Sequence, residues 1–148
     1  MKKEKTIVEC IFCQEKDFLR IDVHKYWIVK SSEGLYSTCY LHNEDILFVL
    51  NTFRKIGKEG YDCWGGVKEV IEHNENDFIM IKISHGNDKG SYGLAQLSIY
   101  NEKSGPSITF EYYVDDPMNP EDSLYKFLME LEKYVPNEDK DKIIPQWR

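Results

Sequence analysis

Residues Leu35–Gly57 have the sequence LYSTCYLHNEDILFVLNTFRKIG, in which a strand pattern gives way to a helix pattern. We expect Leu35–Leu41 to be a strand. Asn43 is then expected to cap a helix whose first turn contains Glu44 and Asp45, where the helix dipole favours anions. The helix should end at Gly57, because glycine is typical of helix C-termini. Its predicted buried face consists of Ile46, Leu47, Val49, Leu50, Phe53 and Ile56.

Further strand patterns lie on both sides of this unit. Before it, the predicted strands are Thr6–Cys13, Phe18–Val23 and Tyr26–Val29; after it, they are Val67–Glu72, Phe78–Ser84, Gly93–Tyr100 and Ser107–Val114. Val67–Glu72 also fits a helix, but the turn residues that flank it favour a strand. A second helix is predicted from a cap at Asn119 to a stop at Pro136, with a buried stripe of Leu124, Phe127, Leu128, Leu131 and Val135.

This order of elements predicts an α+β fold. Consecutive strands joined by short turns pair antiparallel, so we expect one antiparallel sheet of about seven strands with two α-helices packed on it. The chain has 148 residues, which is enough for one domain with its own core. We predict a single domain over residues 1–148, in which the charged segment 137–142 is mobile.

The net negative charge is concentrated near the end of the chain. Glu111–Asp139 contains nine carboxylates and two lysines, which accounts for the whole net charge of −7. Such a surface repels nucleic acid and attracts basic proteins, so we expect no nucleic-acid partner. We expect no membrane partner either, because no window approaches the ~18 consecutive apolar residues of a membrane span. The N-terminus has no signal-peptide pattern, so the predicted location is the cytoplasm.

The cysteines allow two interpretations. Cys10 with Cys13, and Cys39 with His42, form two ligand pairs at the spacing of a structural zinc site. Against zinc, a strand would direct Cys10 and Cys13 to opposite faces. Buried, reduced cysteines are therefore the favoured interpretation, with no metal and no cofactor.

Two other classes of function stay open. A Cys–His enzyme would need Cys39 or Cys63 close to a histidine, namely His24, His73 or His85. A small-ligand or carbohydrate-binding module would use Trp64, in its glycine-flanked loop, together with surface tyrosines as a stacking platform. The same Trp64 would also suit a protein partner, because tryptophan is enriched at interface hot spots.

From Tyr26 to Tyr134 the chain resembles the WapI-type immunity proteins, which protect bacteria from the toxic tips of wall-associated or secreted polymorphic toxins. The likeness consists of the spacing of strands, the Gly34 turn and a helix that opens at Asp45-Ile46. It continues through Phe110 in the last strand and Leu124, Phe127 and Leu131 in the final helix. The chain departs from the pattern at Asp115–Asp122, which carries extra residues and two prolines.

The resemblance implies a non-enzymatic, cytoplasmic inhibitor that binds one cognate toxin domain as a monomer or weak homodimer. A toxin that cleaves nucleic acid tends to have a basic active site, to which an acidic partner would be steered. Acidic steering residues and aromatic anchors together make up the predicted partner-binding set: Trp64, Tyr112, Asp115, Asp116, Glu121, Asp122 and Tyr125.

Overall fold

The computed structural model describes residues 6–27, 35–59, 67–84, 92–103, 107–113 and 123–145. In chain order they form β1 (Thr6–Gln14), β2 (Phe18–Trp27), β3 (Leu35–His42), the 3₁₀ helix η1 (Asn43–Asp45), α1 (Ile46–Glu59), β4 (Val67–Asn74), β5 (Asp77–Ser84), β6 (Tyr92–Tyr100), β7 (Ser107–Tyr113), α2 (Ser123–Glu132) and the 3₁₀ helix η2 (Asn137–Lys142). The segment that also fitted a helix, Val67–Glu72, is therefore a strand.

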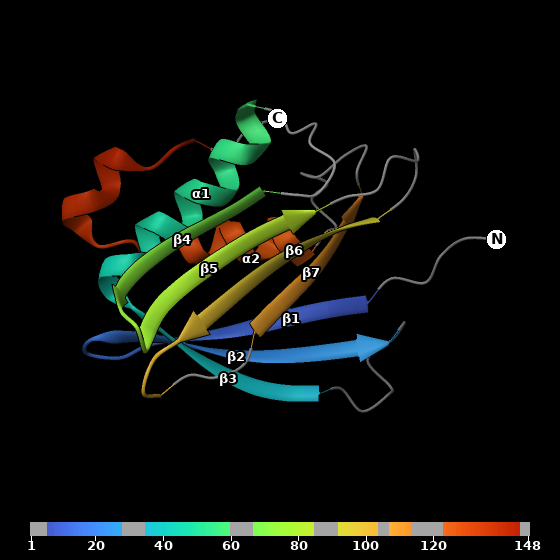
Figure 1. The fold of residues 1–148 in the computed structure, drawn as a ribbon, viewed down its shortest axis with the longest axis horizontal. Helices are drawn as coiled ribbons and strands as arrows, with labels where there is room; N and C mark the ends of the chain where they lie inside the picture. The colour runs from blue at the N-terminus through green and yellow to red at the C-terminus, as the bar shows by residue number, and fades with distance from the viewer. Residues whose placement is uncertain are drawn as a thin grey trace.

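The strands form two antiparallel sheets, a three-stranded sheet in the order β1-β2-β3 and a four-stranded sheet in the order β4-β5-β6-β7 (Figure 1). The predicted α+β class and antiparallel pairing are confirmed, but the prediction of one sheet of about seven strands is wrong. The reason is the 14-residue helix α1, which separates β3 from β4 in the chain. Short turns enforce pairing only within each run of strands, so the two runs form separate ladders.

The register of the first sheet gives it one apolar face. Phe12 pairs with Ile21, and Ile21 pairs with Cys39, so these three side chains share a face. The opposite face carries Cys13 opposite Arg20. Because side chains alternate along each strand, this register turns the apolar set toward the core.

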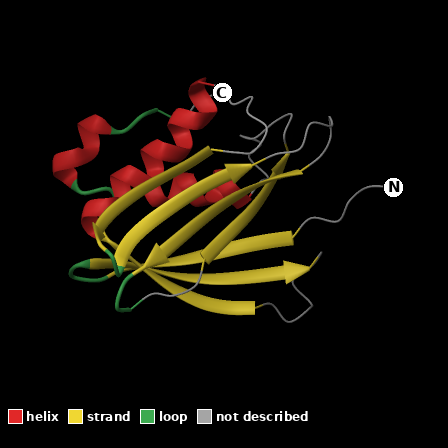
Figure 2. Cartoon of the chain, viewed as in Figure 1, coloured by secondary structure: helices red, strands yellow, loops and turns green. Residues whose placement is uncertain are grey.

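The core lies between the sheets and the two helices, which are on the same side of the strands (Figure 2). Helix α2 contacts both β1 and β7, and α1 contacts α2, so α2 joins the two sheets. One continuous cluster of buried side chains includes residues from both sheets and both helices: Val8, Leu19, Ile21, Val23, Cys39, Leu41, Ile46, Val49, Leu50, Phe53, Ile79, Ile81, Ala95, Leu97, Ile99, Ile108, Leu124, Phe127, Leu128, Leu131 and Val135.

Both predicted ends of the first helix are wrong. Asn43 makes no capping bond to the helix. Its side-chain Nδ2 donates to the Lys16 carbonyl at 3.0 Å, and its Oδ1 accepts from Gln14 Nε2 at 2.7 Å. The side chain that was expected to cap the helix therefore fastens the β1–β2 turn. At the other end, α1 continues through Gly57 to Glu59, so that glycine lies inside the helix.

The segment after α2 is fastened to α1. Residues 137–142 form η2, and the next residues run along the helix. Asn51 Nδ2 donates to the Lys142 carbonyl at 3.0 Å, and Asn51 Oδ1 accepts from the Ile144 amide at 2.8 Å. One side chain thus holds the backbone of two residues, and the expected mobility of 137–142 in solution stays a prediction.

Candidate functional site

Most of the predicted partner-binding residues lie outside the described residues: Trp64, Asp115, Asp116, Glu121 and Asp122. Tyr112 is in β7, where its backbone pairs with Gly93 of β6. Tyr125 is on α2, where its half-buried side chain packs against the core. The four acidic residues belong to the connection between Tyr113, the last residue of β7, and Ser123, the first residue of α2.

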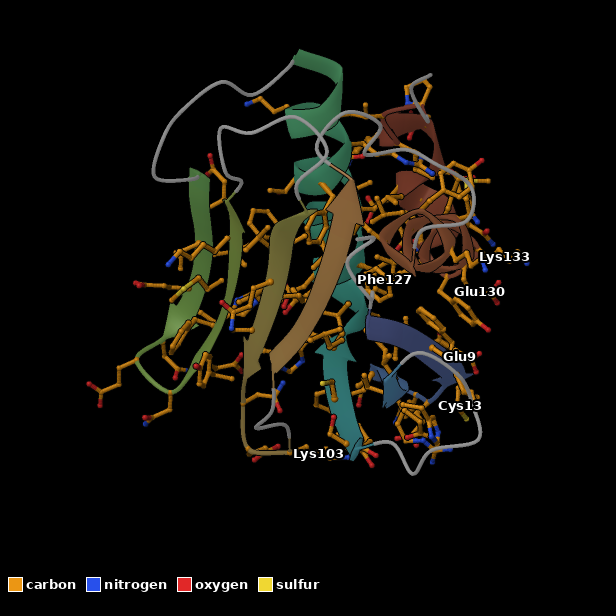
Figure 3. The ribbon with its side chains drawn as sticks, turned by 90° about the vertical axis from the view of Figure 1, so that its right-hand side faces the viewer. Glu9, Cys13, Lys103, Phe127, Glu130 and Lys133 are labelled. Atoms are coloured by element: carbon orange, nitrogen blue, oxygen red, sulfur yellow. The ribbon has the colours of Figure 1, made fainter. Side chains whose placement is uncertain are left out.

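Among the described residues of the acidic region, three carboxylates have cationic partners. Glu130 of α2 pairs with Lys133, the residue after that helix, at 3.0 Å (Figure 3). Asp139 pairs with Lys142 at 3.4 Å, and Glu132 pairs with the buried Arg54. Five of the other six carboxylates lie within residues 111–122, where there is no lysine or arginine. By sequence, the excess negative charge is therefore concentrated in residues 111–122, at the end of β7 and in the connection to α2.

The cysteine and histidine pairs considered for zinc do not share a side of the first sheet. Cys10 and Cys39 lie on the inner face, whereas Cys13 lies in register with Arg20 on the outer face. His42 pairs with Phe18, which belongs to that outer register. Burial raises the pKa of Cys10 to about 12, so its thiol stays protonated at neutral pH. These positions do not converge on one metal ion.

The Cys–His enzyme gains no support from the residues that the structure describes. Cys39 is fully buried on the inner face of the first sheet. His24, one of its possible partners, pairs with Glu9 on the opposite face. Another, His73, faces a carboxylate instead, as described next; Cys63 and His85 lie outside the described residues.

A polar cluster lies where β3 and η1 meet the β4–β5 hairpin. His73 of β4 places Nε2 3.0 Å from both carboxylate oxygens of Asp45 in η1, and 3.9 Å from Glu44 Oε1. Beside this pair, His42 of β3 places Nε2 3.1 Å from Asp77 Oδ2 of β5. The two imidazole rings are 5.9 Å apart. Two His–carboxylate pairs therefore connect the first sheet and η1 with the second sheet.

Burial and ion pairing shift the pKa values of Asp45 and His73 in opposite directions. Asp45 is only 1% exposed, and its removal from water raises the pKa of its carboxyl although His73 acts in the opposite direction. The hydrogen bond to Asp45 raises the pKa of His73, with further contributions from Asp77 and Glu44. The folded protein therefore favours the imidazolium form of His73 opposite a buried carboxylate.

The pairing predicts a pH-dependent contribution to stability. Because the pKa of His73 is raised on folding, its ionisation stabilises the folded protein fully below the unfolded pKa of 6.5. This stabilisation is lost as the pH rises through the pKa of the folded protein. His73→Gln keeps a hydrogen-bond donor but loses the charge. We expect it to destabilise the protein by about 1–3 kcal/mol near pH 6 and by clearly less near pH 8.5.

Urea unfolding of both proteins, in EDTA, measures this difference across the pH range. An equal loss at both pH values would mean that the charge of His73 contributes nothing.

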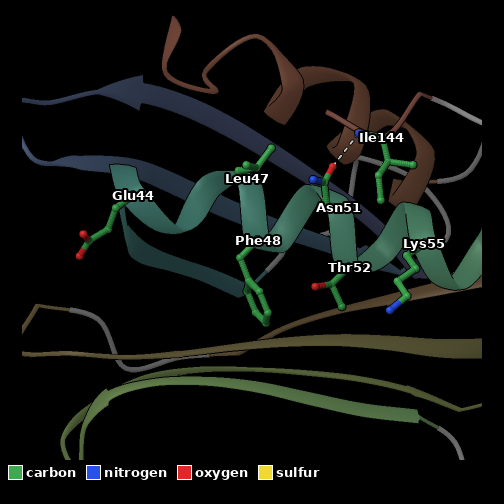
Figure 4. Close-up of a pocket in the computed structure, with 7 residues that line it drawn as sticks. All are labelled: Glu44, Leu47, Phe48, Asn51, Thr52, Lys55 and Ile144. Carbon is green, nitrogen blue, oxygen red and sulfur yellow. Dashed lines mark hydrogen bonds between the residues drawn. The ribbon is translucent and has the colours of Figure 1, made fainter. Parts of the chain in front are cut away.

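A shallow groove of about 350 Å³ runs along α1 (Figure 4). Its walls carry apolar side chains between Glu44 at one end and Lys55 near the other, and its lining is Glu44, Leu47, Phe48, Asn51, Thr52, Lys55 and Ile144. Phe48 is the one aromatic ring in this lining. A carbohydrate site generally presents a stacking platform of tyrosine or tryptophan, so this groove does not favour the ligand-binding alternative.

Sequence reasoning missed the His–carboxylate cluster because its members are far apart in the chain. His73 is 28 residues from Asp45, and His42 is 35 residues from Asp77. Asp45 was assigned to the first turn of a helix, a position that carboxylates also take for the helix dipole alone. The available signal was the acidic pair Glu44 and Asp45, which begins two residues after His42, but the sequence does not show which hairpin faces it.

A comparison of the chain with protein-family models, with curated proteins and with solved structures finds no match. Within the described ranges, no helix is long and apolar enough to cross a membrane.

Proposed function

We propose that this protein is a cytoplasmic, non-enzymatic immunity protein that binds and neutralises one cognate toxin domain. The observation that carries the proposal is the charge of residues 111–122, which contain five carboxylates and no lysine or arginine. Cations compensate Glu130, Glu132 and Asp139 elsewhere in the acidic region. By sequence, the segment 111–122 therefore has the highest density of negative charge in this part of the chain.

A basic toxin domain, such as a nuclease, matches this charge. Its active site must hold phosphate groups, and a carboxylate-rich segment offers similar charge. Complementary charge accelerates encounter and rejects partners of the same sign. In this proposal Asp115, Asp116, Glu121 and Asp122 steer the toxin, and aromatic anchors at Trp64, Tyr112 and Tyr125 supply contact area once it is bound.

The test uses the C-terminal domain of a secreted toxin encoded beside this gene. Co-expression with wild-type protein should restore growth, and the purified pair should form a 1:1 complex. The triple variant Asp115→Lys, Asp116→Lys, Asp122→Lys should bind at least about tenfold more weakly, mainly through slower association. The dependence of its affinity on salt should also be smaller.

A matched control reverses three exposed carboxylates on and beside β4, Glu69, Glu72 and Glu75. It changes the net charge by the same amount, and we expect its affinity to stay within about threefold of wild type. If neither growth rescue nor a complex is seen, the immunity proposal fails. If a complex forms and both triple variants bind alike, the toxin does not use residues 111–122.

A further inference from the structure

We propose that Glu44, Asp45 and His73 form a binding site for a first-row divalent cation, with Zn²⁺ as the best match. One ligand atom from each residue lies within 4.8 Å of the other two. His73 Nε2 is 3.0 Å from either oxygen of Asp45 and 3.9 Å from Glu44 Oε1. In a tetrahedral zinc site with bonds near 2.0–2.1 Å, ligand atoms are about 3.3 Å apart, so these distances lie on either side of the required value.

The kinds of ligand select the class of ion. An imidazole nitrogen suits zinc, cobalt or nickel, whereas magnesium and calcium prefer sites made of oxygen alone. Two carboxylates with one imidazole give three protein ligands, and water can take the fourth position. His73 would bind the ion through neutral Nε2, the atom that otherwise donates to Asp45.

The three proposed ligands differ in burial, so the Asp45 side of the site is rigid and the Glu44 side can move. Asp45 is 1% exposed and directly precedes Ile46, the first residue of α1, so its carboxylate is held in place. The Glu44 side chain is 71% exposed and can move the short distance needed to close on an ion. Ligand entry and exchange are therefore possible from the Glu44 side.

The local charge also favours a dication. Glu44, Asp45 and Asp77 bring three carboxylates around the imidazoles of His42 and His73. Three carboxylates this close together, one of them buried, are costly without compensating positive charge. A bound dication supplies that compensation and would join η1 to β4, which belongs to the other sheet.

Calorimetric titration of EDTA-treated, desalted protein with ZnCl₂ tests the site without any toxin, so its result is independent of the proposed function. We expect one Zn²⁺ per chain and a rise in melting temperature, because an ion that binds only the folded state stabilises it. His73→Ala and Asp45→Asn should each weaken binding at least about tenfold. Glu44→Gln should do the same without affecting folding, because that side chain is exposed.

The matched control is His42→Ala, which removes the neighbouring imidazole and leaves the three ligands in place; its affinity should stay within about threefold of wild type. In NMR spectra, Zn²⁺ should shift the Nε2 resonance of His73. The proposal is overturned if no zinc binds up to about 100 µM. It is also overturned if Glu44→Gln and Asp45→Asn bind zinc like wild type, which is the result expected if cysteines held the ion. An equal loss of zinc affinity in His42→Ala and His73→Ala would overturn it as well.

Discussion

Replacing Arg54 with alanine should lower the free energy of unfolding by about 3–5 kcal/mol, because a large, fully buried side chain and its hydrogen bonds would be lost. The Arg54 side chain is fully buried on α1. Its guanidinium is paired with Glu132 of α2, donates to the Ile144 carbonyl at 2.9 Å, and lies 3.8 Å from Met129 Sδ. Alanine would leave a cavity and an unpaired carbonyl where α1, α2 and the C-terminal segment meet.

Two variants make this result interpretable. Arg54→Met keeps most of the volume, and Glu132, whose side chain is 38% exposed, can turn to water, so we expect a smaller loss of about 1–3 kcal/mol. Lys55→Ala changes the exposed neighbour on the same helix and should stay within about 0.5 kcal/mol of wild type. Urea unfolding measures all three. If Arg54→Ala were no less stable than Lys55→Ala, the buried Arg54 side chain would not contribute to stability.

Phe127→Ala should cost about 3–5 kcal/mol, because a large side chain in the core would be removed. Phe127 is 3% exposed on α2, and its ring lies 5.7 Å from that of Phe12 on β1. Phe12 in turn stacks on Tyr134 at 5.5 Å. Since α2 contacts both sheets, this cavity would weaken the joint between them as well as the helix itself.

The matched control for Phe127 is its neighbour Lys126, which is exposed on the same helix. Lys126→Ala should lie within about 0.5 kcal/mol of wild type. Thermal unfolding followed by circular dichroism compares the two variants. A loss below about 1 kcal/mol for Phe127→Ala would show that the aromatic contact between α2 and β1 is not a major part of the core.

Local patterns predicted the elements well where one face is buried. The apolar stripe of the first helix was correct at Ile46, Val49, Leu50 and Phe53, all of which are buried. The stripe of the second helix was correct at Leu124, Phe127, Leu128 and Leu131. The predicted stop at Pro136 was wrong, because α2 ends at Glu132, so the buried Val135 lies beyond the helix. These patterns repeat every three or four residues, so a single segment contains the whole signal.

Features that depend on contacts between distant segments were not predicted. Arginine is a residue type that is mostly exposed, yet the fold buries Arg54 against residues 75 to 90 positions later. The split into two sheets has the same origin, because strand order across a helix depends on tertiary packing. The partner-binding residues were chosen by charge and residue type, and their assignment stays a prediction.

The long separation between Arg54 and its partners has a consequence for synthesis of the chain. Glu132 follows Arg54 by 78 residues, and Ile144 follows it by 90. At usual rates of translation, the Ile144 carbonyl is made roughly 5–18 seconds after Arg54. During that interval neither Glu132 nor Ile144 is available to the guanidinium, and its burial without their hydrogen bonds is costly. The final packing of α1 is therefore a late step of biogenesis that begins once residue 144 has left the ribosome.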